Sequence, residues 1–179
     1  RSGTELQAAY YTDSRNRIHW FDPYFAKQQK MLDRSIPDQE VWIASDSDDN
    51  RRMVILSTSA RDPGSYFLYE PQAKKMDRFA GVNDRIDPAQ MAETKYETYT
   101  ARDGTKISAY LTIPKGRQPE NLPLVILPHG GPFGVRDTMD FNMEVQFLAS
   151  RGYVVLRPNF RGSGSYGENF YKLGEGEIG

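Results

Sequence analysis

A short apolar run that ends in a pair of glycines constrains the fold of this chain more than any other feature. Leu124–Leu127 is followed by Pro128, His129 and then Gly130-Gly131. A continuous apolar run of this length is typical of a strand buried on both faces of a parallel sheet. The glycines have no Cβ, so backbone N–H groups there can approach another group closely. The loop is therefore interpreted either as a tight turn or as a place where N–H groups meet negative charge.

The residues beyond this loop predict a helix and a second buried strand. Apolar side chains within 140–151 recur at i, i+4 and i+7, which is the spacing of one helix face. Gly152 follows at the position where a helix C-terminus favours a left-handed residue, and Tyr153–Leu156 is apolar again. A strand, a helix and a strand in this order predict a right-handed crossover and a parallel sheet.

A hairpin is predicted upstream of the glycine loop. Strands are expected at Thr94–Ala101 and Lys106–Ile113, and Asp103-Gly104 between them is a strong hairpin turn signal. In the second strand, apolar residues at 107, 109, 111 and 113 alternate with Ser, Tyr and Thr. One face of that strand is expected to pack, while the other stays more polar.

Residues 6–80 have the texture of short strands separated by polar turns. The segment 24–33 lacks Gly and Pro and predicts a helix inserted into a connection. Gly81–Met91 is polar and irregular, and it is expected to link two domains. Strands at this spacing are typical of a sandwich, a barrel or propeller blades. The expected strands are residues 8–12, 17–21, 40–45, 52–57 and 65–69, with turns at 13–16, 46–51, 62–64 and 71–75.

Composition excludes several classes of function. Lys and Arg number 23, Asp and Glu number 24, and the two signs are interspersed, so the sequence shows no basic stripe for nucleic acid. No apolar run approaches the roughly 18 residues of a membrane-spanning helix. The absence of cysteine excludes disulfides and thiolate metal ligands. The acidic clusters at 46–49 and 84–87 are interpreted as solvated turns, and no metal site is predicted. Compartment and oligomeric state stay open.

The glycine loop predicts half of an active site. In an α/β-hydrolase, an N–H of such a loop and the N–H of the residue after the nucleophile together bind the oxyanion. Gly131 is the expected first donor, with Gly130 beside it. The nucleophile motif Gly-x-Ser-x-Gly occurs nowhere in the 179 residues. His129 is expected to hold the loop through side-chain hydrogen bonds, because the catalytic His of that fold follows the nucleophile along the chain. His19 is expected to be structural.

Gly162–Gly167 matches the pattern G-x-G-x-x-G, yet it does not predict a dinucleotide site. In such a site the glycines follow the strand at once, whereas Arg157–Arg161 intervenes here, so no cofactor is predicted. Neither Ser163 nor Ser165 has glycines at both −2 and +2, so neither is a predicted nucleophile. A loop that positions other groups is the favoured interpretation. Arg161 is then expected to bind carbonyls or a carboxylate, with substrate contact as the alternative.

Three motif-like stretches follow one another along the chain: Ala101–Pro114, Leu127–Phe133 and Arg157–Glu168. The first is similar to the hairpin that opens the catalytic domain of the prolyl oligopeptidase family of serine peptidases. The second is similar to that family's oxyanion-loop motif, and the third to its Asn-x-Arg-Gly-Ser-x-x-Tyr-Gly loop. Within the family the chain most closely resembles the acylaminoacyl-peptidase and dipeptidyl-aminopeptidase-like branch. Pro132 stands where lipase-like esterases usually have glycine, which favours a peptidase.

The resemblance implies a mixed fold, in which the C-terminal end of a β-propeller precedes the N-terminal part of an α/β-hydrolase domain. Residues 1–81 would form partial propeller blades, residues 82–93 a linker, and residues 94–179 the start of the hydrolase domain. The Ser, Asp and His of the catalytic triad would follow Gly179. The chain by itself is therefore expected to be inactive.

The implied activity is hydrolysis of short peptides, at amino- or acylamino-terminal units, by acyl transfer and without a cofactor. The expected partner is a short peptide, with neither nucleic acid nor membrane, and self-association of the full-length protein stays open. The alternatives are a carboxylesterase of the same fold and a non-catalytic propeller–hydrolase binding protein. The site residues that the resemblance implies are Gly131 as oxyanion donor, His129 and Gly130 in the same loop, and Pro132, Arg161 and Gly162 as structural neighbours.

Overall fold

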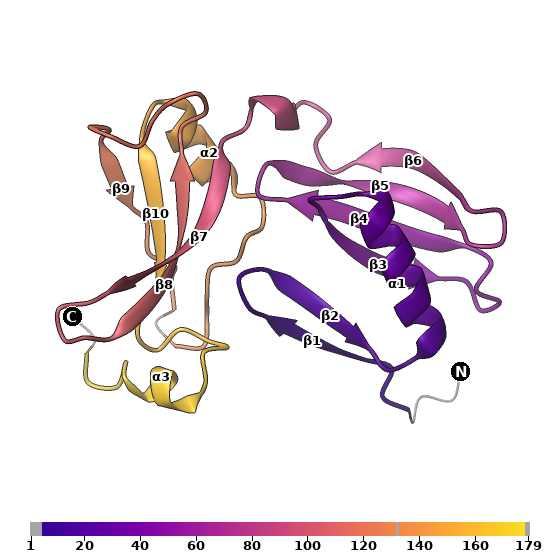
Figure 1. The fold of residues 1–179 in the computed structure, drawn as a ribbon, viewed down its shortest axis with the longest axis horizontal. Coiled ribbons are helices and arrows are strands. Elements are labelled where there is room, and N and C mark those ends of the chain that lie inside the picture. Colours follow the sequence, from indigo (N-terminus) through magenta and orange to yellow (C-terminus); the bar gives the residue numbers. More distant parts are fainter. Residues whose placement is uncertain (1–4, 132, 178–179) are drawn as a thin grey trace. The chain divides into compact units, whose positions relative to one another are not determined.

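The computed structural model describes residues 5–131 and 133–177, and these form two compact units that divide after Pro88 (Figure 1). The division at Pro88 falls inside the segment 82–93 that the sequence predicts as a linker. Within the described residues, no helix combines the length and the apolar character needed to cross a membrane. Each unit is built on its own sheet, and the two are described separately.

The first unit is an antiparallel sheet with a hairpin and a helix. Consecutive strands pair in the order β3-β4-β5-β6, and β1 pairs separately with β2. Figure 1 shows this meander in purple and magenta, with α1 lying against it. The elements are β1 (Ala8–Thr12), β2 (Asn16–Trp20), α1 (Pro23–Ser35), β3 (Glu40–Asp46), β4 (Met53–Ser59), β5 (Asp62–Glu70) and β6 (Lys75–Gly81).

Helix α1 forms where the sequence predicts a helix, and it covers the core of this unit. The Asp22 side chain caps it by accepting from the backbone N–H groups of Tyr24 and Phe25, and Pro23 occupies the first turn, where its missing N–H costs nothing. Phe25 and Leu32 are 2% and 1% exposed. The buried cluster that these two residues join also contains Val41, Met53, Ile55 and Tyr69.

Two sequence predictions in this unit are wrong. Residues 62–64 were expected as a turn, yet β5 begins at Asp62 and the pairing register shifts between Ser57 and Ser59. Pro63 and Gly64 therefore lie in a bulge, where a missing N–H and a positive φ of +127° are tolerated. Strand β6 was not predicted. It is an exposed edge strand, and its Lys, Asp and Arg residues interrupt the alternation of apolar and polar residues that indicates a strand.

The second unit is a mixed sheet whose last two strands are parallel. The strand order is β7-β8-β10-β9, with antiparallel pairs except for β9 with β10. The parallel pair joined through a helix confirms the predicted strand–helix–strand segment. The elements are η1 (Pro88–Gln90), at the junction of the units, then β7 (Glu93–Thr100), β8 (Lys106–Ile113), β9 (Leu124–Ile126), α2 (Met143–Ser150), β10 (Val154–Asn159) and α3 (Glu168–Lys172).

The hairpin between β7 and β8 confirms the Asp103-Gly104 turn, with Gly104 at φ +88° and the N–H of Ala101 bonded to the carbonyl of Thr105 at 2.8 Å. The expected polar face of β8 is not solvated, because Tyr110 and Thr112 are both 0% exposed. Neighbouring polar groups cover them instead: the Arg136 guanidinium lies 3.4 Å from the Tyr110 hydroxyl. A central strand thus buries both faces.

Strand β9 is not the buried strand that its sequence predicts. Leu124 and Ile126 are 53% and 60% exposed. Within the described residues β9 pairs only with β10, so it forms the edge of the sheet and one of its faces is left uncovered. Helix α2 also begins three residues later than expected, because the Asn142 side chain accepts from the Val145 N–H and caps it.

Candidate active site

The candidate site lies on two loops that follow the parallel strands. Residues 127–138 leave β9 and residues 160–167 leave β10, so both start from the same edge of the sheet, where open α/β sheets bind ligands. The loops are joined by backbone hydrogen bonds, from Gly134 N–H to the Gly162 carbonyl and from Gly164 N–H to the Val135 carbonyl, each 3.0 Å. The structure thereby brings the predicted residues 129–131, 161 and 162 onto adjoining loops.

His129 is fixed on three sides. Its Nε2 lies 2.8 Å from the Ser163 Oγ, its Nδ1 lies 2.7 Å from the Gly130 carbonyl oxygen, and its ring stacks on Phe160 with centroids 4.4 Å apart. A carbonyl oxygen can only accept, so Nδ1 carries the proton. In the neutral ring, Nε2 then accepts from the Ser163 hydroxyl. These contacts tie the imidazole to both loops.

Gly131 is exposed and adopts a φ of +150°, a region that side-chain-bearing residues rarely occupy. A Cβ placed there would lie 3.2 Å from the Phe133 backbone nitrogen. Glycine at this position therefore serves the backbone conformation of the loop. Pro132, predicted as a structural neighbour of the site, lies outside the described residues.

Gly162 makes room for an aromatic side chain of the glycine loop. A Cβ on Gly162 would lie 3.0 Å from Phe133 Cδ1, and one on Gly174 would lie 2.8 Å from Phe133 Cε1. Gly162 also has a φ of +88°, and its N–H bonds to the Phe170 carbonyl at 3.1 Å. The Phe133 ring thus lies directly against two glycines.

Arg161 forms an ion pair with Asp103 of the β7–β8 hairpin. The backbone N–H of Thr105 and the Arg161 guanidinium lower the pKa of Asp103 from the usual 3.8 to about 2. A carboxylate partner is one of the two kinds that the sequence predicts for Arg161. This pair fastens the loop after β10 to the hairpin.

The Asp103 carboxyl should titrate near pH 2 in an NMR pH titration. Because its folded-state pKa lies below the unfolded value, its stabilising effect is present above about pH 4 and is lost as the pH falls towards 2. Asp103→Asn should therefore lower stability at pH 7 and change it little at pH 2. In an Arg161→Gln control the midpoint should rise but stay below 3.8, since the Thr105 N–H remains. A midpoint near 3.8 in the unmodified chain would contradict the assignment.

A buried polar cluster lies beside the site, and the sequence did not predict it. The Asn159 side chain, 0% exposed, pairs with both backbone groups of Asp137: it accepts from the N–H at 2.7 Å and donates to the carbonyl at 3.1 Å. The Arg157 guanidinium donates to the Asp137 carboxylate and to the Thr138 carbonyl, each at 3.1 Å. These residues hold the end of the glycine loop against β10. Asn159, the Asn of the third motif, is the residue in the sequence that could have indicated this cluster.

Tyr166 completes this cluster. Its hydroxyl accepts from Arg136 and from Asn159, each at 2.9 Å, and the Arg136 guanidinium lies 4.4 Å from the ring centroid. Burial raises the pKa of Tyr166 to about 12, so the phenol stays protonated at neutral pH. Tyr166 is therefore a neutral bridge between the two loops.

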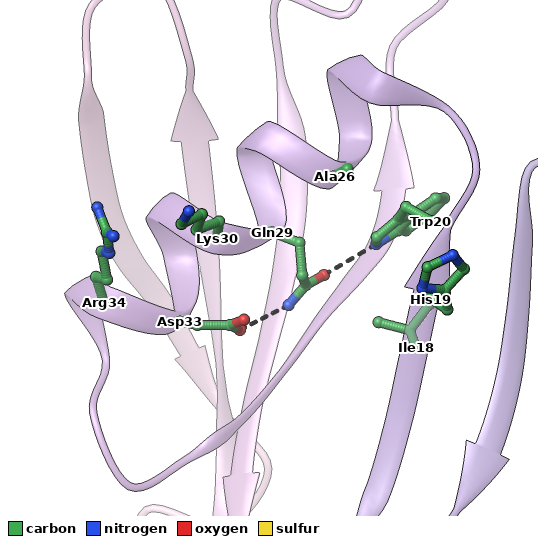
Figure 2. A pocket seen from close by; sticks show the side chains of 8 residues that line it. All are labelled: Ile18, His19, Trp20, Ala26, Gln29, Lys30, Asp33 and Arg34. Carbon is green, nitrogen blue, oxygen red and sulfur yellow. Dashed lines mark hydrogen bonds between the residues drawn. The ribbon is translucent and has the colours of Figure 1, made fainter.

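The first unit contains a separate cleft of about 390 Å³ between β2 and α1 (Figure 2). Gln29 spans it, accepting from the Trp20 indole at 3.3 Å and donating to the Asp33 carboxylate at 2.8 Å. In Figure 2, Lys30 and Arg34 point away from Gln29, so their charges do not converge. Across the described ranges, no cluster of three or more His, Asp or Glu side chains could hold a metal ion.

Comparisons with known proteins show what the chain is similar to. Residues 139–179 match the model of the prolyl oligopeptidase family. Dipeptidyl aminopeptidase BIII of Pseudoxanthomonas mexicana is 28% identical over 97% of this chain and 26% of its own length. A puromycin-hydrolyzing peptidase of Mycobacterium tuberculosis has a similar fold, with a TM-score of 0.65 at 21% identity over 93% of this chain and 26% of that one. The acylaminoacyl peptidase of Pyrococcus horikoshii gives 0.60 at 22% identity, over 92% and 25%.

A mostly-sheet chain with a glycine loop after a parallel strand matches peptidases whose architecture combines a propeller and a hydrolase domain. The family match and the relatives support the resemblance to the prolyl oligopeptidase family of serine peptidases that the motifs in the sequence indicate. The chain spans about a quarter of the length of two curated relatives that it matches.

Proposed function

We propose that these residues belong to a longer serine peptidase and supply its oxyanion loop. The observation that carries this proposal is the position of the glycine loop. It follows β9, the third strand of its sheet in chain order, and α/β-hydrolases supply an oxyanion N–H from the loop after their third strand. On this proposal residues 1–81 are the end of a propeller, 82–93 a linker and 94–179 the start of the hydrolase domain.

The proposed chemistry is acyl transfer to a serine supplied by a segment outside these residues. When the serine attacks a peptide carbonyl, negative charge develops on the carbonyl oxygen, and the N–H of Gly131 donates to it. The N–H of the residue after the nucleophile is the second donor. His129 and Gly130 position the first donor, while Arg161 and Gly162 hold the adjoining loop. Removing one such donor typically costs about 2.7–4 kcal/mol in the transition state.

The proposed substrates are short peptides cleaved at amino- or acylamino-terminal units. The relatives are named as a dipeptidyl aminopeptidase, a puromycin-hydrolyzing peptidase and an acylaminoacyl peptidase, and the first and third names refer to aminopeptidase and acylaminoacyl cleavage. A propeller in front of the hydrolase domain would restrict entry to substrates of that size.

Residues 1–179 alone should not hydrolyse a dipeptide p-nitroanilide, and a fluorophosphonate probe should not label them, because the serine is supplied elsewhere. The longer protein should do both. The measurements are release of p-nitroaniline and in-gel fluorescence at equal protein concentrations. Turnover by residues 1–179 would contradict the assignment. A longer protein that cleaves matched esters but not amides would be a carboxylesterase, and one that the probe does not label would be a binding protein.

A further inference from the structure

The peptide unit between Gly130 and Gly131 links His129 to the proposed oxyanion donor. A peptide unit is planar and trans, so the carbonyl of Gly130 and the N–H of Gly131 point in opposite directions and turn together. His129 Nδ1 lies 2.7 Å from the Gly130 oxygen. A hydrogen bond at the carbonyl end therefore sets the direction of the N–H at the other end.

His129 can make this bond in only one of its neutral forms. A neutral imidazole carries its proton on Nδ1 or on Nε2, and a partner at one nitrogen selects the form. With the proton on Nε2, the lone pair of Nδ1 would face the lone pairs of the Gly130 oxygen. A donor at Nε2 removes that alternative. The Ser163 Oγ lies 2.8 Å from Nε2 and can be that donor.

Ser163 is itself held rigidly. It is 0% exposed, and its backbone N–H bonds to the Phe160 carbonyl at 3.0 Å. Phe160 also carries the stacked His129 ring. One short turn thus supplies both the surface that supports the imidazole and a hydroxyl within hydrogen-bond distance of its Nε2.

We propose that Ser163 is a positioning residue of the oxyanion loop. Its buried hydroxyl donates to His129 Nε2, keeps the imidazole proton on Nδ1, and so directs the Gly131 N–H through the Gly130 carbonyl. This inference rests on the proposed role of Gly131 as the oxyanion donor. Ser163 acts through His129 and does not touch substrate.

In the longer protein, Ser163→Ala should lower kcat about tenfold and change KM less than about twofold, which corresponds to the loss of one net hydrogen bond in the transition state. The affinity for a peptide boronate, whose tetrahedral adduct places an oxygen in the oxyanion site, should fall in parallel. The affinity for a non-covalent product peptide should not change. A merely structural residue would not separate these two affinities. Ser165→Gly is the matched control, because Ser165 is exposed and has a positive φ of 64°.

The decisive comparison is the effect of Ser163→Ala in a protein that already carries His129→Asn. The Asn amide can donate to the Gly130 oxygen from about the place of Nδ1 and has no tautomers, so Ser163→Ala should add less than about twofold there. If Ser163→Ala does not fold, Ser163→Cys keeps the volume and only a weak donor, and its kcat should fall at constant KM. An equal loss of kcat in both backgrounds, or a change in KM alone, would overturn the proposal. A normal kcat in Gly131→Ala would instead remove the oxyanion assignment itself.

Discussion

Gly131→Ala in the longer protein should lower kcat by about 10²- to 10³-fold and leave KM nearly unchanged. The new Cβ would sit at a φ of +150° and 3.2 Å from the Phe133 nitrogen, so the loop has to move. Movement displaces the N–H that we propose meets the developing charge, whereas binding of the ground-state substrate would not depend on that contact. Steady-state kinetics on a dipeptide p-nitroanilide measures both constants.

The control for this substitution is Gly116→Ala. Gly116 also has a positive φ, +72°, and a Cβ there would meet nothing within 4 Å. It should therefore lose some stability from backbone strain alone, with kcat unchanged. An unchanged kcat in Gly131→Ala, or an equal loss in both variants, would exclude Gly131 from the oxyanion site.

Arg157→Ala should destabilise the fold by about 3–5 kcal/mol, the largest stability effect expected for a polar side chain of the second unit. The side chains of Arg157 and Asp137 are only 5% and 14% exposed. Removing the guanidinium leaves the Asp137 carboxylate and the Thr138 carbonyl without their donor in a nearly dry environment. Denaturant unfolding measures the change in the free energy of unfolding. Hydrogen exchange of backbone amides in the second unit assigns that change to this unit.

The matched control is Lys75→Ala, which breaks an exposed pair with Asp77 whose side chains are 61% and 57% exposed. Water and salt screen exposed pairs, so the stability of this variant should be close to that of the unmodified protein. Asp137→Asn added to Arg157→Ala should recover part of the loss, because it removes the unpaired charge. A loss below about 1 kcal/mol in Arg157→Ala would show that water reaches the Asp137 carboxylate.

Local signals predicted the elements that define the site. The pair Asp103-Gly104 marked the hairpin and Gly152 the end of α2, because each residue type suits one backbone geometry. Burial was predicted less well. The apolar run at 124–126 forms a partly exposed edge strand, and Tyr110 lies in the core. Burial depends on which strands become neighbours, and that information is not local.

The polar contacts of the site were the hardest to foresee. Nothing in the sequence pairs Asn159 with the backbone of Asp137, or Ser163 with His129, because the partners lie 22 and 34 positions apart. The order of three motifs indicated the resemblance to the family, although none of these contacts was predicted. The order of the motifs reflects the order of the structural elements in the fold, whereas the hydrogen-bond partners depend on how the two loops pack against each other.

The contact of Phe133 with Gly162 and Gly174 limits how this loop can be transplanted. Residues 129–135 grafted into another hydrolase would bring an aromatic ring that needs two glycines on segments that are not contiguous with the graft. Any side chain at either position would push the ring, and the proposed oxyanion donor two residues before it, out of place. Engineering or evolutionary drift at this motif therefore has to change three separated stretches of chain at once.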